Sequence, residues 1–96
     1  MPLYTFILEY KGGTYLSQAS SGSPGTAFVK GAESLQAVQV TGLGNKGKAS
    51  LIEQMKTNKI TPIAGLTNVW CNTALINGRL AIVNVIRTEQ ILPPPL

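Results

Sequence analysis

The sequence contains no histidine and no aspartate, and its only cysteine is Cys71. Without histidine there is no Ser-His-Asp triad and no Cys-His pair, and the commonest general acid–base residue is missing. Histidine and cysteine also supply most zinc ligands, and one cysteine cannot form an internal disulfide. We therefore predict a protein that is not an enzyme, binds no cofactor or metal, and is not a disulfide-stapled secreted module.

Charged residues and long apolar runs are also scarce. Asp, Glu, Lys and Arg together make up 12% of the chain, which is about half the usual share. A chain with so little charge must bury its apolar residues in a compact fold or against a partner. It has no run of apolar residues long enough to span a membrane, and no export signal opens it. We expect a soluble, cytoplasmic protein without a membrane partner.

The net charge of +4 is partly local. Lys46, Lys48, Lys56 and Lys59 lie in a stretch whose only acid is Glu53. A patch of this size is compatible with an anionic partner. It is far from a dense basic tract, so we interpret it as an ordinary solvated surface.

The first 20 residues have the pattern of a β-hairpin. Residues 3–10 have a period of two, with Tyr4, Phe6, Leu8 and Tyr10 on one side and Thr5, Ile7 and Glu9 on the other, which predicts a strand. Lys11-Gly12-Gly13 predicts the turn, with a bulge at the glycines, and residues 14–18 predict the return strand. Residues 19–25 have the composition of a loop.

Part of this hairpin is similar to a known family. Residues 4–10 (Tyr-Thr-Phe-Ile-Leu-Glu-Tyr), together with Gly12, Gly13 and Tyr15, resemble the opening hairpin of HicB-type antitoxins. Those proteins are small regulators that bind a partner toxin through an α+β domain. The resemblance is confined to these residues, and it implies a protein-binding function.

Two helices are predicted in the middle of the chain. Ser23 and Pro24 are typical of a helix start, and the first helix is expected to run to residue 37. Its apolar face is expected to contain Phe28, Ala32 and Leu35. Gly31 within it costs about 1 kcal/mol relative to alanine. Val38 and Val40 either extend this helix or form a short extended piece.

The second helix is predicted over residues 48–57. Its apolar side is expected to consist of Leu51, Ile52 and Met55. Pro62 ends the helical region, because the residue before a proline avoids the helical conformation.

The glycine-rich stretch between these helices, residues 40–49, matches two nucleotide-binding patterns in part. Its three glycines fit G-x-G-x-x-G, but no acidic residue follows at the required distance and the chain is too short for that fold. Residues 42–48 fit G-x-x-x-x-G-K, but Ala49 stands where magnesium binding requires Ser or Thr. We therefore reject both interpretations.

The same stretch resembles the loop of helix-hairpin-helix DNA-binding elements, through residues 40–46 (Val-Thr-Gly-Leu-Gly-Asn-Lys). In that family a glycine turn points backbone N–H groups at a phosphate, with a lysine nearby. Thr41 departs from the family's common proline. The resemblance implies that the residues in contact with an anion or nucleic acid are Gly42, Gly44, Lys46, Gly47 and Lys48. The alternative, which we favour, is a tight interhelical turn that needs glycine for positive φ.

The last hairpin is the strongest pattern in the sequence. Residues 67–76 and 79–88 flank Asn77-Gly78, the dipeptide best suited to a type I′ turn, which sets Leu75 opposite Leu80. Both faces of the last strand are apolar. Either it is a central strand with both faces covered, or one face is buried against another subunit. The predicted interface residues are Trp70, Val83 and Val85.

Together these elements predict an α+β fold in the order ββααββ, with a four-stranded antiparallel sheet built of two hairpins and two helices packed on one face. Residues 1–91 are expected to form one small domain, and residues 92–96 (Leu-Pro-Pro-Pro-Leu) a proline-rich tail. We predict a non-catalytic protein-interaction module of the regulatory or antitoxin/immunity type, acting through a protein partner or through self-association as a homodimer. The alternative is weak, sequence-independent nucleic-acid binding through the Gly-Lys loop, residues 42–48.

Overall fold

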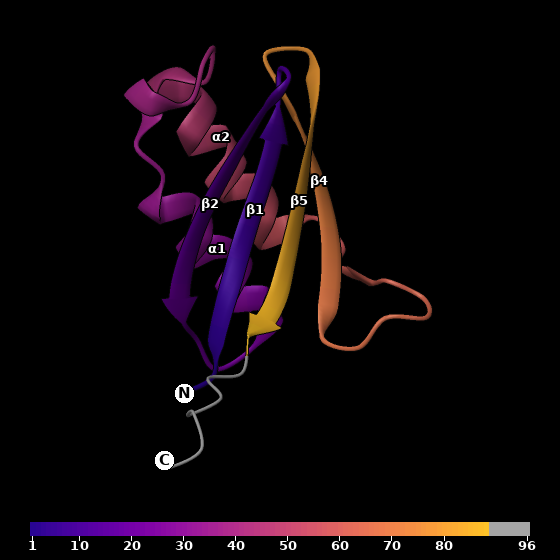
Figure 1. The fold of residues 1–96 in the computed structure, drawn as a ribbon. Helices are drawn as coiled ribbons and strands as arrows, with labels where there is room; N and C mark the ends of the chain where they lie inside the picture. The colour runs from indigo at the N-terminus through magenta and orange to yellow at the C-terminus, as the bar shows by residue number, and fades with distance from the viewer. Residues whose placement is uncertain (89–96) are drawn as a thin grey trace.

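The structure is a computed structural model that describes residues 1–88. The predicted proline-rich tail and the predicted domain end at residue 91 lie outside the described residues. Within residues 1–88 the chain forms two α-helices, a short 3-10 helix and five strands (Figure 1). In chain order these are β1 (Leu3–Tyr10), β2 (Gly13–Ser20), α1 (Pro24–Ser34), η1 (Ala37–Gln39), α2 (Gly44–Thr57), β3 (Thr61–Pro62), β4 (Val69–Ile76) and β5 (Arg79–Thr88).

The strands form one antiparallel sheet in the order β2-β1-β5-β4-β3, which confirms the α+β class. The predicted number of four strands is wrong, because Thr61 and Pro62 pair with Cys71 and Trp70 as a fifth strand. The residue before a proline favours extended backbone, and a proline is tolerated at a sheet edge where its missing N–H would face solvent. Pro62 therefore fits the edge strand, whereas α2 has already ended at Thr57, with Asn58 in extended backbone.

The β4–β5 hairpin has the predicted register, with Leu75 opposite Leu80. Asn77 and Gly78 both have positive φ, at 52° and 76°, as a type I′ turn requires. A two-residue turn of this kind fixes the register of the pairs that follow it, although β4 begins at Val69, two residues after the predicted start at residue 67.

The β1–β2 hairpin is tighter than predicted. Its turn contains only Lys11 and Gly12, with φ of 50° and 80°, and Gly13 is already paired with Tyr10. The register then continues without interruption, so the predicted bulge is absent and the predicted start of the second strand at residue 14 is wrong. The difference arises because Lys11 itself adopts the left-handed conformation, which leaves Gly13 free to pair.

Helix α1 begins where it was predicted. The Ser23 hydroxyl accepts a hydrogen bond from the Thr26 backbone N–H at 3.3 Å, so Ser23 is the N-cap. The helix ends at Ser34, three residues before the predicted end at residue 37. The Ser34 hydroxyl donates to the Gly31 carbonyl, a local bond that competes with continuation of the helix. Val38 lies exposed in η1 rather than in a longer helix.

Helix α2 begins at Gly44, four residues before the predicted start at residue 48, and ends at Thr57 as predicted. Gly47 is therefore inside the helix. A Cβ there would lie 3.1 Å from Leu43 Cδ1 and 3.2 Å from Ile76 Cγ2, so glycine lets the first turn of α2 approach the end of β4. Nothing in the local sequence pattern indicates this close packing.

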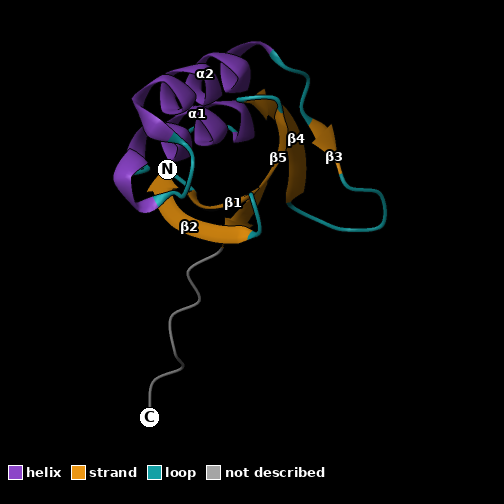
Figure 2. Ribbon diagram, turned by 90° about the horizontal axis from the view of Figure 1, so that it is seen from above, coloured by secondary structure: helices purple, strands orange, loops and turns teal. Residues whose placement is uncertain are grey.

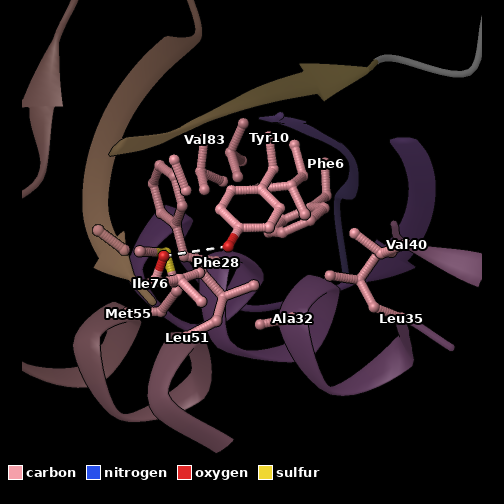
Figure 3. Close-up of a cluster of buried hydrophobic side chains, with 14 of the residues drawn as sticks. Phe6, Tyr10, Phe28, Ala32, Leu35, Val40, Leu51, Met55, Ile76 and Val83 are labelled. Carbon is pink, nitrogen blue, oxygen red and sulfur yellow. Dashed lines mark hydrogen bonds between the residues drawn. The ribbon is translucent and has the colours of Figure 1, made fainter. Parts of the chain in front are cut away.

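The two helices cover one face of the sheet, and the sheet curves around them (Figure 2). Between these layers lies a core to which every main element contributes (Figure 3). Its largest fully buried members include Phe6, Leu8, Tyr10, Phe28, Leu51, Ile76, Val83 and Val85. The Tyr10 hydroxyl donates to the Ile76 carbonyl at 3.0 Å inside this core, so the end of β1 is joined to the end of β4.

Candidate interaction surface

The other face of the sheet has no helix over it in residues 1–88. Because the sheet curves around α1 and α2, this face is convex (Figure 2). Successive side chains of a strand point to opposite faces, so the register assigns the members of each face. We call the following set the convex face: Leu3, Thr5, Ile7 and Glu9 in β1; Thr14, Leu16, Gln18 and Ser20 in β2; Val69, Cys71, Thr73 and Leu75 in β4; Leu80, Ile82, Asn84, Ile86 and Thr88 in β5.

The convex face is almost uncharged, and about half of its members are apolar. Glu9 is its only charged member among the strand residues defined above. Large apolar side chains are well exposed on it, with Leu16 at 64%, Leu75 at 65% and Leu80 at 57%. Leu75 and Leu80 are directly opposite one another, and Leu16 is opposite Ile7. Depletion of charge with apolar side chains clustered on neighbouring strands is typical of the centre of a protein interface.

The three predicted interface residues lie on the side of the sheet that faces the helices. Val83 and Val85 are fully buried in the core of this chain, so no partner can reach them in this fold. Trp70 is half-buried on the same side, with its ring centroid 6.1 Å from that of Tyr4. On β5 the outward apolar residues are instead Leu80, Ile82 and Ile86. The last strand is central, as one of the two predicted arrangements requires, but helices cover only one of its faces.

Sequence reasoning missed Leu16, Leu75 and Leu80 as candidate contacts. One signal for the orientation of the sheet was present in the second hairpin. Ala74 and Ala81 are opposite one another and buried, and such small side chains let a helix approach the sheet closely. The large residues of the next pair, Leu75 and Leu80, then have to lie on the uncovered face.

The glycines of the Gly-Lys loop have structural roles in this fold. Gly42 and Gly44 have positive φ, at 78° and 67°, a conformation that favours glycine. The Asn77 side chain donates to the Gly42 carbonyl at 3.1 Å, which holds the loop against the β4–β5 turn. A Cβ on Gly42 would lie 2.7 Å from Lys11 Nζ, so the β1–β2 turn lies beside the loop as well.

The structure does not bring the two lysines of this loop together. Lys46 and Lys48 are two positions apart in α2, and side chains at that spacing point about 200° apart around a helix. Lys48 lines a shallow surface pocket together with Glu33 and Asn45. The lysine that lies against Gly42 is Lys11. The five residues predicted to contact an anion therefore do not form one cluster, and the buried Gly47 belongs to the packing of α2.

Known proteins offer no match to this chain. We compared it with models of protein families, with curated proteins and with solved structures, and none matches. In the part of the chain that the structure describes, no helix combines the length and the apolar character needed to cross a membrane. Nor do three or more His, Cys, Asp or Glu residues come together there in a way that could hold a metal ion.

Proposed function

We propose that this chain is a non-catalytic protein-interaction module that binds a protein partner through its convex face. The observation that carries the proposal is the exposure of Leu16, Leu75 and Leu80 on a sheet face whose only charged strand residue is Glu9. Exposed apolar surface that no element of the chain covers marks interaction sites in proteins that are otherwise well packed.

The energy available from this face supports a specific complex. Complete burial of one leucine contributes about 1.5–3 kcal/mol relative to full exposure. Leu16, Leu75 and Leu80 are already partly buried, so about 1–2 kcal/mol of that remains for each of them. A micromolar complex requires a net binding free energy of about 8 kcal/mol after the cost of association. A partner must therefore also cover the isoleucines of the same face, Ile7, Ile82 and Ile86.

The curvature of the sheet defines the shape of the partner. Two convex surfaces touch over only a few side chains, so a second copy placed face to face buries little of this area. A concave surface, or a segment that wraps across the strands, covers more. A regulatory protein of the antitoxin or immunity type would act in this way, by occupying a surface of its partner rather than by chemistry.

The test compares a charged double variant of the convex face with a control elsewhere. Leu75→Lys combined with Leu80→Lys places two like charges opposite one another on neighbouring strands. The control is Val38→Lys, because Val38 is 92% exposed and lies in η1 rather than on the sheet. We expect the tagged wild-type chain and the control to capture the same partner from the native cell, and the double variant to lose it.

Cys71 provides a second measurement at the same surface. It is half-exposed on the convex face, opposite Asn84, and its thiol is free. We expect the captured partner, once purified and added back, to slow alkylation of Cys71 in the wild-type chain and the Val38→Lys control. Retention of the partner by the double variant, or an alkylation rate that the bound partner leaves unchanged, would show that the convex face is not the contact.

A further inference from the structure

The two edges of the sheet are protected very differently. At one edge, β3 contributes only two residues, one of them Pro62. Side chains of α2 and of its C-cap residue cover the rest of β4 there: Gln54 donates to the Leu75 carbonyl at 2.8 Å and accepts from the Leu75 N–H at 2.9 Å. Asn58 donates to the Thr73 carbonyl at 2.8 Å. Short strands, prolines and covering groups are the ways in which proteins prevent an edge from pairing with another chain.

The opposite edge of the sheet, formed by β2, is neither shortened nor interrupted by a proline. Its eight residues, Gly-Thr-Tyr-Leu-Ser-Gln-Ala-Ser, include no charge and no proline, and its register with β1 has no bulge. Next to a two-residue turn, the first residue pair, Tyr10 with Gly13, exchanges two backbone hydrogen bonds. Along the two strands, hydrogen-bonded pairs then alternate with pairs that are not hydrogen-bonded. Thr14, Leu16 and Gln18 therefore direct their backbone N–H and C=O groups outward.

Within residues 1–88 no group covers the backbone of these three residues as α2 covers β4. The only outward group of β2 with a recorded partner is the Ser20 carbonyl, which accepts from Lys30 Nζ at 2.9 Å. Beside the strand lies an open groove of about 430 Å³, lined by Thr14, Leu16 and Ser17 on one side and by Leu35 and Gln39 on the other. The edge of β2 thus has free hydrogen-bonding groups and space next to them.

We propose that β2 pairs with β2 of a second copy of this chain, antiparallel and across a two-fold axis. The symmetry follows from the edges that a second copy offers. Its β3 edge cannot serve, because it is short, contains Pro62, and continues into backbone already bonded to Gln54 and Asn58. Only β2 remains, so the contact uses the same surface on both copies and closes as a dimer. The two sheets then become one, with a protected β3 edge at each end.

The side chains of β2 suit this pairing. With the axis near Leu16, the two Leu16 side chains meet at the centre of the interface on the convex side, and Thr14 lies opposite Gln18 of the other copy. The β2 strand itself carries no charge, so its own side chains bring no like charges together in a chain whose net charge is +4. This inference concerns the edge of the sheet and does not depend on the partner proposed for the convex face.

Charge variants at Leu16 test the dimer. We expect the wild-type chain to sediment as a dimer. Leu16→Lys and Leu16→Glu, each alone, are expected to raise the dimer dissociation constant about tenfold or more, because a central apolar contact is replaced by a pair of like charges. An equimolar mixture of the two variants is expected to restore the dimer, because opposite charges then meet at the axis. A separate partner protein bound at Leu16 would not produce this rescue.

Leu75→Lys and Leu75→Glu are the matched controls, since Leu75 is 65% exposed and Leu16 is 64% exposed. Both controls are expected to remain dimers, and circular dichroism verifies that all four variants fold. Amide hydrogen exchange gives an independent readout: as the protein concentration rises, exchange should slow at Leu16 and Gln18 but not at Leu75.

Three results would overturn the inference. One is a wild-type chain that stays monomeric at high concentration, and another is a mixture of the Leu16 variants that remains as monomeric as each variant alone. The third is a dimer that the Leu75 variants dissociate while the Leu16 variants do not, because that dimer would use the convex face. Loss of the captured partner by the Leu75/Leu80 double variant, with an intact dimer, would leave both proposals standing.

Discussion

Gly31 lies in the middle of α1 where the helix crosses β1, and it provides the sharpest test of this packing. Intrinsic helix propensity alone predicts that Gly31→Ala stabilises the fold by about 1 kcal/mol. The structure predicts the opposite. A Cβ at this position would lie 2.7 Å from Phe6 Cβ and still closer to two ring carbons, whereas real Cβ atoms essentially never come within 3.0 Å of another heavy atom.

The magnitude follows from how little Phe6 can move. Its side chain is 2% exposed and is surrounded by the core, so relief of the clash requires α1 to shift away from the sheet. Overpacking of this kind costs about 1–3 kcal/mol. The gain of about 1 kcal/mol in helix propensity offsets part of that cost. Because the clash is severe, we expect Gly31→Ala to lower the free energy of unfolding by about 1–2 kcal/mol and the Tm by about 5–15 °C.

Denaturant and thermal unfolding monitored by circular dichroism measure this change, and α1 contains its own control. Gly25 lies in the first turn of the same helix, and a Cβ there would lie 3.5 Å from Ile60 Cδ1, an ordinary contact. Gly25→Ala is therefore expected to be stabilising by up to about 1 kcal/mol. In a Phe6→Leu background, Gly31→Ala should cost less than in the wild-type chain. If Gly31→Ala stabilises the wild-type chain as Gly25→Ala does, α1 does not approach β1 as closely as described.

Two further substitutions probe the polar contacts that connect the elements. Tyr10→Phe removes the buried hydroxyl that donates to the Ile76 carbonyl at 3.0 Å, and we expect it to lower the free energy of unfolding by about 1–2 kcal/mol in urea; an unchanged midpoint would mean that this bond contributes nothing. Gln54→Ala uncovers the backbone of Leu75 at the β4 edge. We expect a loss of about 1 kcal/mol and, in sedimentation, species larger than those of the wild-type chain, whereas unchanged association would show that Gln54 does not protect this edge.

The parts of the fold that the sequence predicted correctly are those set by local chemistry. Asn77-Gly78 determines a two-residue turn and with it the register of two strands. Ser23 and Pro24 determine the start of α1. The errors occur where contacts with neighbouring elements determine whether a segment becomes a helix or a strand. Strand β3 exists only because β4 lies beside Thr61, and α2 begins early because Leu43 and Ile76 pack around Gly47.

Only part of the candidate surface could be predicted from the sequence, for the same reason. Alternation along β5 showed two apolar faces, but Val83 and Val85 on one face are as apolar and β-branched as Ile82 and Ile86 on the other. Composition therefore could not decide which face the helices cover. The position of β2 at the edge of the sheet could not be predicted either. The place of a strand within a sheet depends on which strands pair, and these can be far apart in the sequence. The sequence shows that residues 13–20 carry no charge, but it does not show that this strand lies at the edge of the sheet.

The distribution of charge connects the two proposals. All eight lysines and arginines lie outside the convex face: in the β1–β2 turn, in the helices and the segment after α2, and on the helix-facing side of β5. The positions are Lys11, Lys30, Lys46, Lys48, Lys56, Lys59, Arg79 and Arg87. A sequence with little charge thus has no cation on the convex face, and the only one that contacts the outward backbone of β2 is Lys30, at the Ser20 carbonyl. Pairing at β2 would join the convex faces of two copies side by side, with Leu16 and Ile7 of each copy at the junction. A partner that spans this junction would contact both chains, and its affinity would then depend on dimer formation. Under that arrangement Leu16→Lys weakens both the dimer and partner binding, whereas the Leu75/Leu80 double variant weakens partner binding alone.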